Sequence, residues 1–185
     1  MKLRILSATL ATSLMLATGA MAKGPHNPMV GGAAMYASKD IIDNAVNSKD
    51  HTTLVAAVKA AGLVETLKGP GPFTVFAPTN AAFSALPAGT VDTLLKPENK
   101  ATLTSILTYH VVSGRLDTKS LQQQIKAGHG KAVLKTVQGG DLTVTGKGKK
   151  FVVTDVKGNH AHITIANVYQ SNGVILVVDK VLMPN

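Results

Sequence analysis

The chain has 185 residues, a formal net charge of +9 and neither Cys nor Trp. Without Cys it has no disulfide framework, no thiol nucleophile and no Cys to carry a lipid. Its basic residues are spread from Lys23 to Lys180 and there is no Trp for base stacking, so nucleic acid is a disfavoured partner.

The first 22 residues have the pattern of an export signal. Lys2 and Arg4 precede a short apolar core, and Ala20-Met-Ala22 is a small-x-small cleavage site. The apolar run is too short for a comfortable membrane span. We expect no membrane span in the protein after the signal is removed. The sequence predicts cleavage after Ala22 and a secreted or periplasmic bacterial protein. Without these residues, 17 basic and 10 acidic side chains leave a net charge of +7.

Residues 23–36 are rich in Gly and Pro and have no periodic apolar face. This composition predicts a flexible tether between the signal peptide of residues 1–22 and one domain over residues 37–185. Within that domain, apolar residues at helical spacing predict helices around residues 41–46, 54–61, 63–67 and 103–107.

The C-terminal third changes character. Short β-branched runs alternate with Gly, Asp and Asn turns from Ala132 onward, which is typical of strands. Because helices gather in the first half and strands mainly in the second, the pattern predicts an α+β domain. Lys147, Lys149 and Lys150 cluster at an expected hairpin tip, where a solvated turn and a contact to a polyanion are the two explanations.

The segment Phe73-Thr-Val-Phe-Ala-Pro-Thr-Asn-Ala-Ala-Phe83 predicts a rigid corner. Its first five residues suit a strand buried on both faces, and Pro78 ends the ladder because it has no backbone N–H. Thr79 or Asn80 can then cap a helix whose apolar side includes Phe83.

Signatures of catalysis are scarce. The sequence contains no Gly-x-Ser-x-Gly elbow, no His-Glu-x-x-His and no phosphate-binding Gly-rich loop. His160 and His162 are two residues apart and can share one strand face, but two imidazoles without a third ligand favour an edge-strand pair over a metal site. We therefore expect no enzyme activity, no metal and no cofactor.

Tyr109 and His110 stand between an apolar helix and the apolar pair Val111-Val112. They are expected to be extended, with His110 partly buried and in need of a hydrogen-bond partner. Two roles stay open for His110: it ties its strand to a neighbouring loop, or it contacts a ligand. Near the end of the chain, Asp179 interrupts an apolar run and is expected to accept hydrogen bonds from backbone amides.

Three segments resemble the conserved blocks of fasciclin-like domains. They are Thr74–Phe83, the pair Tyr109-His110, and Asn172–Leu182. The resemblance covers residues 37–184 and is to the bacterial, secreted single-domain type. It implies a β-wedge of about seven strands packed against helices, and a non-enzymatic role in adhesion. It also implies two sets of residues: Tyr109 and His110 as candidates for binding, and Thr79, Asn80, Phe83, Asn172, Gly173 and Asp179 as structural.

The chain departs from the family pattern in two places. Leu176 stands where the second block often has His, which replaces a polar contact by an apolar one. Asn167-Val168 aligns with the Asp-Ile pair that the animal adhesion members use toward integrins. Because a metal-dependent receptor requires that carboxylate, integrin-type recognition is not expected.

The leading hypothesis is an exported adhesion or surface-interaction protein that makes protein–protein or protein–matrix contacts. Its expected partners are a cell-surface or matrix protein, a polysaccharide, or a second copy of the chain. The alternative is an extracellular module that binds an acidic or aromatic polymer, such as a cell-wall glycan or lignin-like material, through its positive charge. An exported enzyme ranks third.

Overall fold

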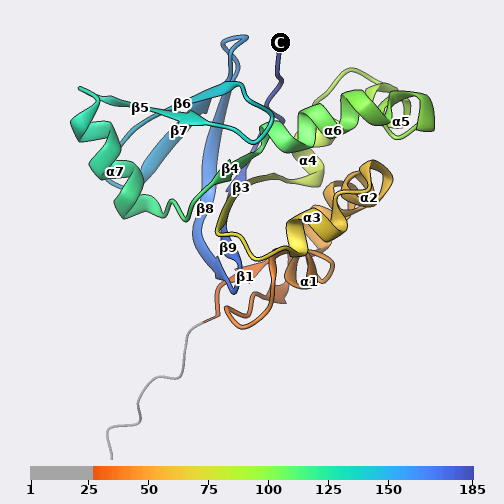
Figure 1. Ribbon diagram of the computed structural model, residues 1–185, viewed down its shortest axis with the longest axis horizontal. Helices are drawn as coiled ribbons and strands as arrows, with labels where there is room; N and C mark the ends of the chain where they lie inside the picture. Colours follow the sequence, from red (N-terminus) through yellow and green to blue (C-terminus); the bar gives the residue numbers. More distant parts are fainter. Residues whose placement is uncertain (1–26) are drawn as a thin grey trace, which may run out of the picture.

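The computed structural model describes residues 27–185. All the helices of the described residues come before the last five strands of the main sheet, and most of them pack on one side of it (Figure 1). The helices are α1 (Ile41–Ala45), α2 (Thr52–Ala61), α3 (Val64–Lys68), α4 (Asn80–Ser84), α5 (Thr90–Leu94), α6 (Lys100–Tyr109) and α7 (Thr118–Ala127), with single 3₁₀ turns at Lys49–His51 and Pro97–Asn99. The strands are β1 (Met29–Val30), β2 (Ala33–Ala34), β3 (Phe73–Pro78), β4 (Val111–Ser113), β5 (Lys131–Lys135), β6 (Asp141–Lys147), β7 (Lys150–Thr154), β8 (His160–Gln170) and β9 (Gly173–Val178).

The main sheet has seven strands in the order β4-β3-β9-β8-β7-β6-β5. Only β3 and β9 run parallel, and every other neighbouring pair is antiparallel. A bridge between Val112 and Thr136 links β4 to the segment after β5, so the two ends of the sheet approach one another. The predicted α+β class and the wedge of seven strands are therefore confirmed.

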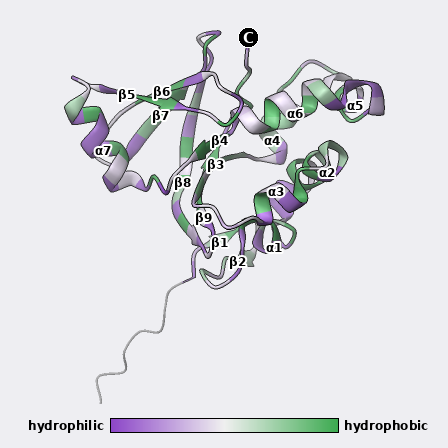
Figure 2. Cartoon of the chain, in the orientation of Figure 1, coloured by the Kyte–Doolittle hydropathy of each residue, from purple (hydrophilic) through white to green (hydrophobic). Residues whose placement is uncertain are grey.

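The parallel pair at the centre of the sheet separates two apolar cores. Along β3 and β9, Val75 and Ile175 face a core shared with α1 to α6, whereas Phe76 and Leu176 face a second core under α7 and strands β5 to β7. All six residues of β9 are buried. Such two-sided burial explains why β9 is continuously apolar and why β3 is apolar except at Thr74 (Figure 2).

The N-terminal segment differs from the expected tether. Residues 29–34 form a two-stranded hairpin, β1 with β2, and the side chains of Val30 and Met35 are only 3% and 2% exposed. The backbone amide of Lys49 donates to the carbonyl of Gly31, which fixes the hairpin beside the first 3₁₀ turn. The prediction of a flexible tether is thus wrong for this part of residues 23–36, because two apolar side chains outweigh the Gly-rich composition. The predicted signal peptide and its cleavage site lie outside the described residues.

Candidate functional site

Tyr109 is the last residue of α6, so the expectation that it is extended is wrong. Its ring is fully buried, and its hydroxyl donates to the carbonyl oxygen of Asp141 over 2.7 Å. The same hydroxyl accepts from the backbone amide of Val156 over 3.1 Å. Burial raises the pKa of the phenol above its usual value. Tyr109 therefore joins the end of α6 to the start of β6 and to the turn after β7.

His110 caps α6 and is 2% exposed. Its Nδ1 lies 2.8 Å from the carbonyl oxygen of Ile106, and its Nε2 lies 2.9 Å from the backbone nitrogen of Leu182. A carbonyl can only accept and an amide can only donate, so the ring is neutral with its proton on Nδ1. Burial lowers the pKa of His110 to about 4. The imidazole thus links α6 to the last residues of the chain.

These positions bear on the two roles considered for His110 and on the binding role that the resemblance implies for Tyr109. Neither ring reaches the surface, and each polar atom of both side chains already has a partner inside the domain. A direct contact to a macromolecule would need exposed atoms. The geometry favours an internal structural role for Tyr109 and His110 over the binding role that the resemblance implies.

The corner after β3 has the predicted construction. The hydroxyl of Thr79 accepts from the backbone amide of Ala82 and caps α4, which places Phe83 in the core. The side chain of Asn80 accepts from the amide of Thr53 and donates to the carbonyl of Lys49. Asn80 consequently ties α4 to the start of α2.

Asn172 connects three distant segments at the entrance to β9. Its Oδ1 accepts from the backbone amide of Ile41 over 3.1 Å, and its Nδ2 donates to the carbonyls of Leu67 and Gly69. At the next residue, a Cβ on Gly173 would lie 2.2 Å from the carbonyl oxygen of Phe73. Only glycine allows the parallel strands to approach this closely.

Asp179 accepts from the backbone amide of His162 over 2.7 Å, as the sequence predicted for a backbone-bonding carboxylate. Its second oxygen lies 3.1 Å from Nδ1 of the same histidine. His160 and His162 do share one face of β8, but β8 lies between β7 and β9 and is not an edge strand. The prediction that these histidines lie on an edge strand is wrong, because the edge strands of the sheet are β4 and β5.

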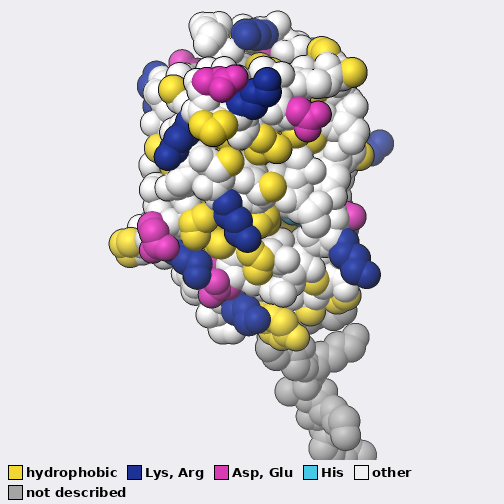
Figure 3. Space-filling view, turned by 90° about the vertical axis from the view of Figure 1, so that its right-hand side faces the viewer, with side chains coloured by type: hydrophobic (Ala, Val, Ile, Leu, Met, Phe, Trp, Pro, Cys, Tyr) yellow, Lys and Arg dark blue, Asp and Glu magenta, His cyan; other side chains and the backbone are white. Residues whose placement is uncertain are grey.

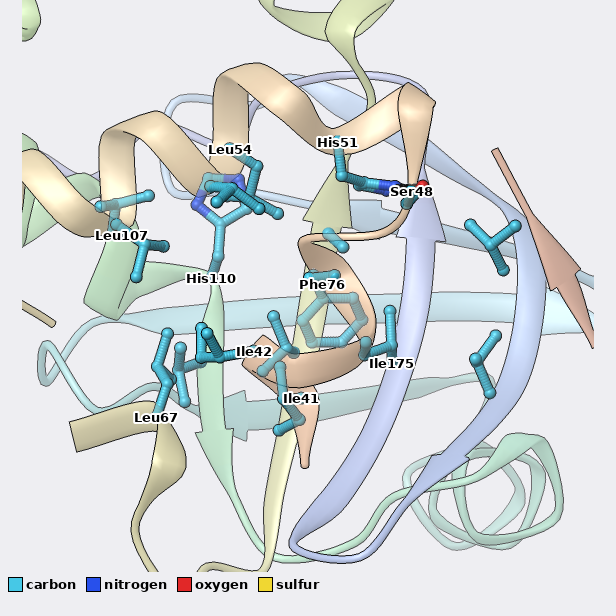
Figure 4. A pocket seen from close by; sticks show the side chains of 18 of the residues that line it. Ile41, Ile42, Ser48, His51, Leu54, Leu67, Phe76, Leu107, His110 and Ile175 are labelled. Carbon is cyan, nitrogen blue, oxygen red and sulfur yellow. Dashed lines mark hydrogen bonds between the residues drawn. The ribbon is translucent and has the colours of Figure 1, made fainter. Parts of the chain in front are cut away.

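Sequence reasoning missed a cavity beside the central strands. It has a volume of about 40 Å³ and is lined by apolar side chains together with Ser48, His51 and His110 (Figure 4). His51 is buried and its Nδ1 lies 2.9 Å from the hydroxyl of Ser48, while its Nε2 has no hydrogen-bond partner among residues 27–185. Burial lowers the pKa of this imidazole. A cavity of this size holds a few waters at ~10–15 Å³ each, and is too small for an organic ligand.

No cluster of metal-ligating side chains is present in the described part of the chain. Residues 27–185 contain no group of three or more His, Asp or Glu that could hold a metal ion. Within the same residues, no helix is long and apolar enough to cross a membrane. In the three recognised segments, every polar side chain except that of the exposed Lys180 is engaged in internal hydrogen bonds.

The fold and these sites define a class: an α+β domain whose characteristic residues hold the structure together. A model of the fasciclin domain matches residues 49–184. The chain belongs to the fasciclin domain family.

Three comparisons place the chain within that family. It is 46% identical to protein sll1483 of Synechocystis sp. over 158 residues, covering 84% of this chain and 79% of that protein. It is 40% identical to the immunogenic protein MPB70 of Mycobacterium bovis over 76% of this chain and 66% of that one. It is 38% identical to the cell surface glycolipoprotein MPB83 of the same species, over 88% and 68% of the two chains.

A solved FAS1 domain pair from the insect cell adhesion molecule Fasciclin I shares the fold. Its TM-score is 0.70 at 16% sequence identity, with 78% of this chain and 51% of that chain covered. The chain thus spans about half the length of that structure.

The two departures from the family pattern have structural explanations. Leu176 is fully buried in the core under α7, where a polar side chain would need a partner. Asn167 has a backbone φ of 59°, and its side chain accepts from the amide of Thr118 and donates to the hydroxyl of Thr118. Asn167 therefore holds the start of α7.

Proposed function

We propose that the protein is an exported, non-enzymatic adhesion or surface-interaction protein. The observation that carries the proposal is the internal use of the polar side chains in the three family segments. Asn172 alone makes three hydrogen bonds within the domain, and His110 makes two. Side chains with internal hydrogen bonds of this kind stabilise the fold. We therefore expect the partner to contact other residues, on the outer surface.

The relatives support the same role. One carries the name of a cell surface glycolipoprotein, and the structural neighbour comes from a cell adhesion molecule. The proposal includes export through the segment of residues 1–22, cleaved after Ala22, to the periplasm or the medium. Its partners are a cell-surface or matrix protein, a polysaccharide or a second copy of the chain.

A strain that lacks the protein tests the proposal. It should lose attachment, cell–cell aggregation or host association relative to its parent, and a plasmid-borne copy should restore the lost behaviour. Unchanged behaviour in all three assays would contradict the proposal. Reproducible turnover in a broad hydrolase screen would replace it with an enzymatic function.

Binding to an acidic or aromatic polymer is the second candidate function. The positive charge of the chain favours it, and such binding would weaken with added salt because it rests on screened charges. Binding to a protein partner that salt does not affect would favour adhesion through protein contacts instead.

A further inference from the structure

The net charge of the described chain is confined to one half of the molecule. Residues 115–157, which include α7 and β5 to β7, contain nine Lys or Arg and three Asp, a net charge of +6. The remaining described residues, 27–114 and 158–185, contain seven basic and seven acidic side chains and are neutral overall. On the helix side the two signs are interspersed (Figure 3). The asymmetry points to an anionic partner for the β5–β7 half.

Within this half, one face of the sheet is uncovered. Helix α7 buries Leu121 and Ile125 against the inner face, together with the inward residues of β5 to β7. The opposite, outer face is exposed or partly exposed along β5 to β7 and at the start of β8, from His160 to Thr164, whereas Val168 further along β8 is buried in the other core. Strand register aligns its residues in rows, such as Lys131, Thr145, Val152 and His162. With neighbouring strands ~4.8 Å apart, this face is about 14 Å across.

Three of the four lysines on this outer face, within the described residues, have no acidic partner. Lys135 is paired with Asp141 at 3.0 Å, but Lys131, Lys147 and Lys150 have no carboxylate within 4.0 Å among residues 27–185. Lys147 and Lys150 are directly opposite each other in the β6–β7 register. Like charges in that position destabilise a hairpin, and a bound anion would relieve the repulsion.

The hairpin that carries these lysines is held in place by α7. The side-chain amide of Gln122 donates to the carbonyl of Gly148 at the tip between β6 and β7. A partner that binds there therefore meets a turn already fixed to the domain, which lowers the entropic cost of binding.

The chemistry of the face narrows the class of anion. Three threonine hydroxyls, from Thr143, Thr145 and Thr154, lie between the lysines and can bond to the hydroxyls of a sugar. No Phe or Tyr of β5 to β7 lies on this face, so these strands offer no such ring for a base to stack on. It also lacks the amphipathic helix by which many proteins enter a membrane surface.

We infer that the outer face of β5 to β8 binds an anionic polysaccharide, with Lys131, Lys147 and Lys150 contacting its acidic groups. This inference rests on the proposed non-enzymatic function and names the surface and the partner class. It assigns the lysine cluster of the hairpin tip to polyanion contact instead of simple solvation.

Polygalacturonate is a suitable probe, with neutral dextran and phosphatidylglycerol vesicles as comparisons. The exported protein, purified as its cells release it, should bind polygalacturonate and not dextran. The triple variant Lys131→Gln, Lys147→Gln, Lys150→Gln should bind at least about tenfold more weakly. A matched variant on the helix side, Lys59→Gln, Lys96→Gln, Lys100→Gln, removes the same charge and should change affinity less than about threefold.

Both variants should fold like the wild type, because all six substitutions are at exposed positions. Circular dichroism provides this control. Equal weakening in the two variants, or stronger binding to the vesicles than to polygalacturonate, would overturn the inference. No binding to polygalacturonate would overturn it as well. If in that case the deletion strain still loses attachment, aggregation or host association, the proposed function stands without this surface. If the strain is unchanged in all three assays, the proposed function fails as well.

Discussion

His110 should make the stability of the domain depend on pH, and replacing it should weaken that dependence. The ring is neutral, 2% exposed and bonded at both nitrogens. His110→Ala leaves the buried amide of Leu182 and the carbonyl of Ile106 without their partner. At pH 7.5 this variant should lose about 3 kcal/mol of unfolding free energy, from the unpaired groups and the cavity.

The effect of acid follows from the two pKa values. In the unfolded chain the imidazole takes up a proton near pH 6.5, whereas in the folded domain its pKa is about 4. The stabilisation is therefore complete above pH 6.5 and is lost as the pH falls toward 4. Each pH unit in this window removes up to about 1.4 kcal/mol, or about 3 kcal/mol in all. His51, whose pKa burial also lowers, acts in the same direction.

Urea unfolding at pH values from 4.5 to 7.5 measures both effects. Far-UV circular dichroism is the appropriate signal because the chain has no Trp. Carboxylates and the other histidines titrate in both proteins, so the difference between wild type and His110→Ala isolates this residue. The difference should be largest at neutral pH and should shrink on acidification. Parallel stability curves would show that His110 is not a buried, neutral group.

Three further substitutions test the internal contacts. Asn172→Ala should lower the free energy of unfolding by about 3 kcal/mol, measured in urea, because it leaves the amide of Ile41 and two carbonyls unpaired. A loss below about 1 kcal/mol would contradict these hydrogen bonds. Gly173→Ala should also cost about 3 kcal/mol, since its Cβ would overlap the carbonyl oxygen of Phe73, and an unchanged melting temperature would refute the close approach. Tyr109→Phe should cost about 1–2 kcal/mol, with the ring packing kept and the hydroxyl bonds to Asp141 and Val156 lost; a larger loss would mean that the ring itself is displaced.

Local chemistry made part of this fold predictable. Pro78 and Thr79 act within a few residues of themselves, so the stop of β3 and the cap of α4 can be deduced from neighbours in sequence. The mostly apolar runs of β3 and β9 indicated burial on both faces, whereas their parallel pairing was not predicted.

Other features of the fold depend on contacts between residues that are far apart in the sequence, and these contacts could not be predicted from it. Asn172 accepts a hydrogen bond from the amide of Ile41, 131 residues away, and neither segment contains a sequence pattern that predicts this contact. The N-terminal hairpin was missed because two buried side chains, Val30 and Met35, carry no periodic signal. The orphaned nitrogen of His51 follows only from the three-dimensional surroundings of its ring.

The charge asymmetry was present in the sequence from the start. It became informative only once the fold showed that residues 115–157 form one half of the molecule, with an uncovered sheet face. The net charge of the whole chain indicated only that the partner is anionic. The charge of each structural unit indicated which surface the partner contacts, the outer face of β5 to β8.

The central claim is that the recognised residues hold the fold and that binding occurs elsewhere on the surface. Complementation of the deletion strain with Tyr109→Phe tests it most directly, once urea unfolding shows the variant folded under the assay conditions. The account predicts full restoration of attachment, because the lost hydroxyl is buried and bonded only within the domain. A folded Tyr109→Phe protein that fails to restore attachment would place Tyr109 in the binding function and contradict the account.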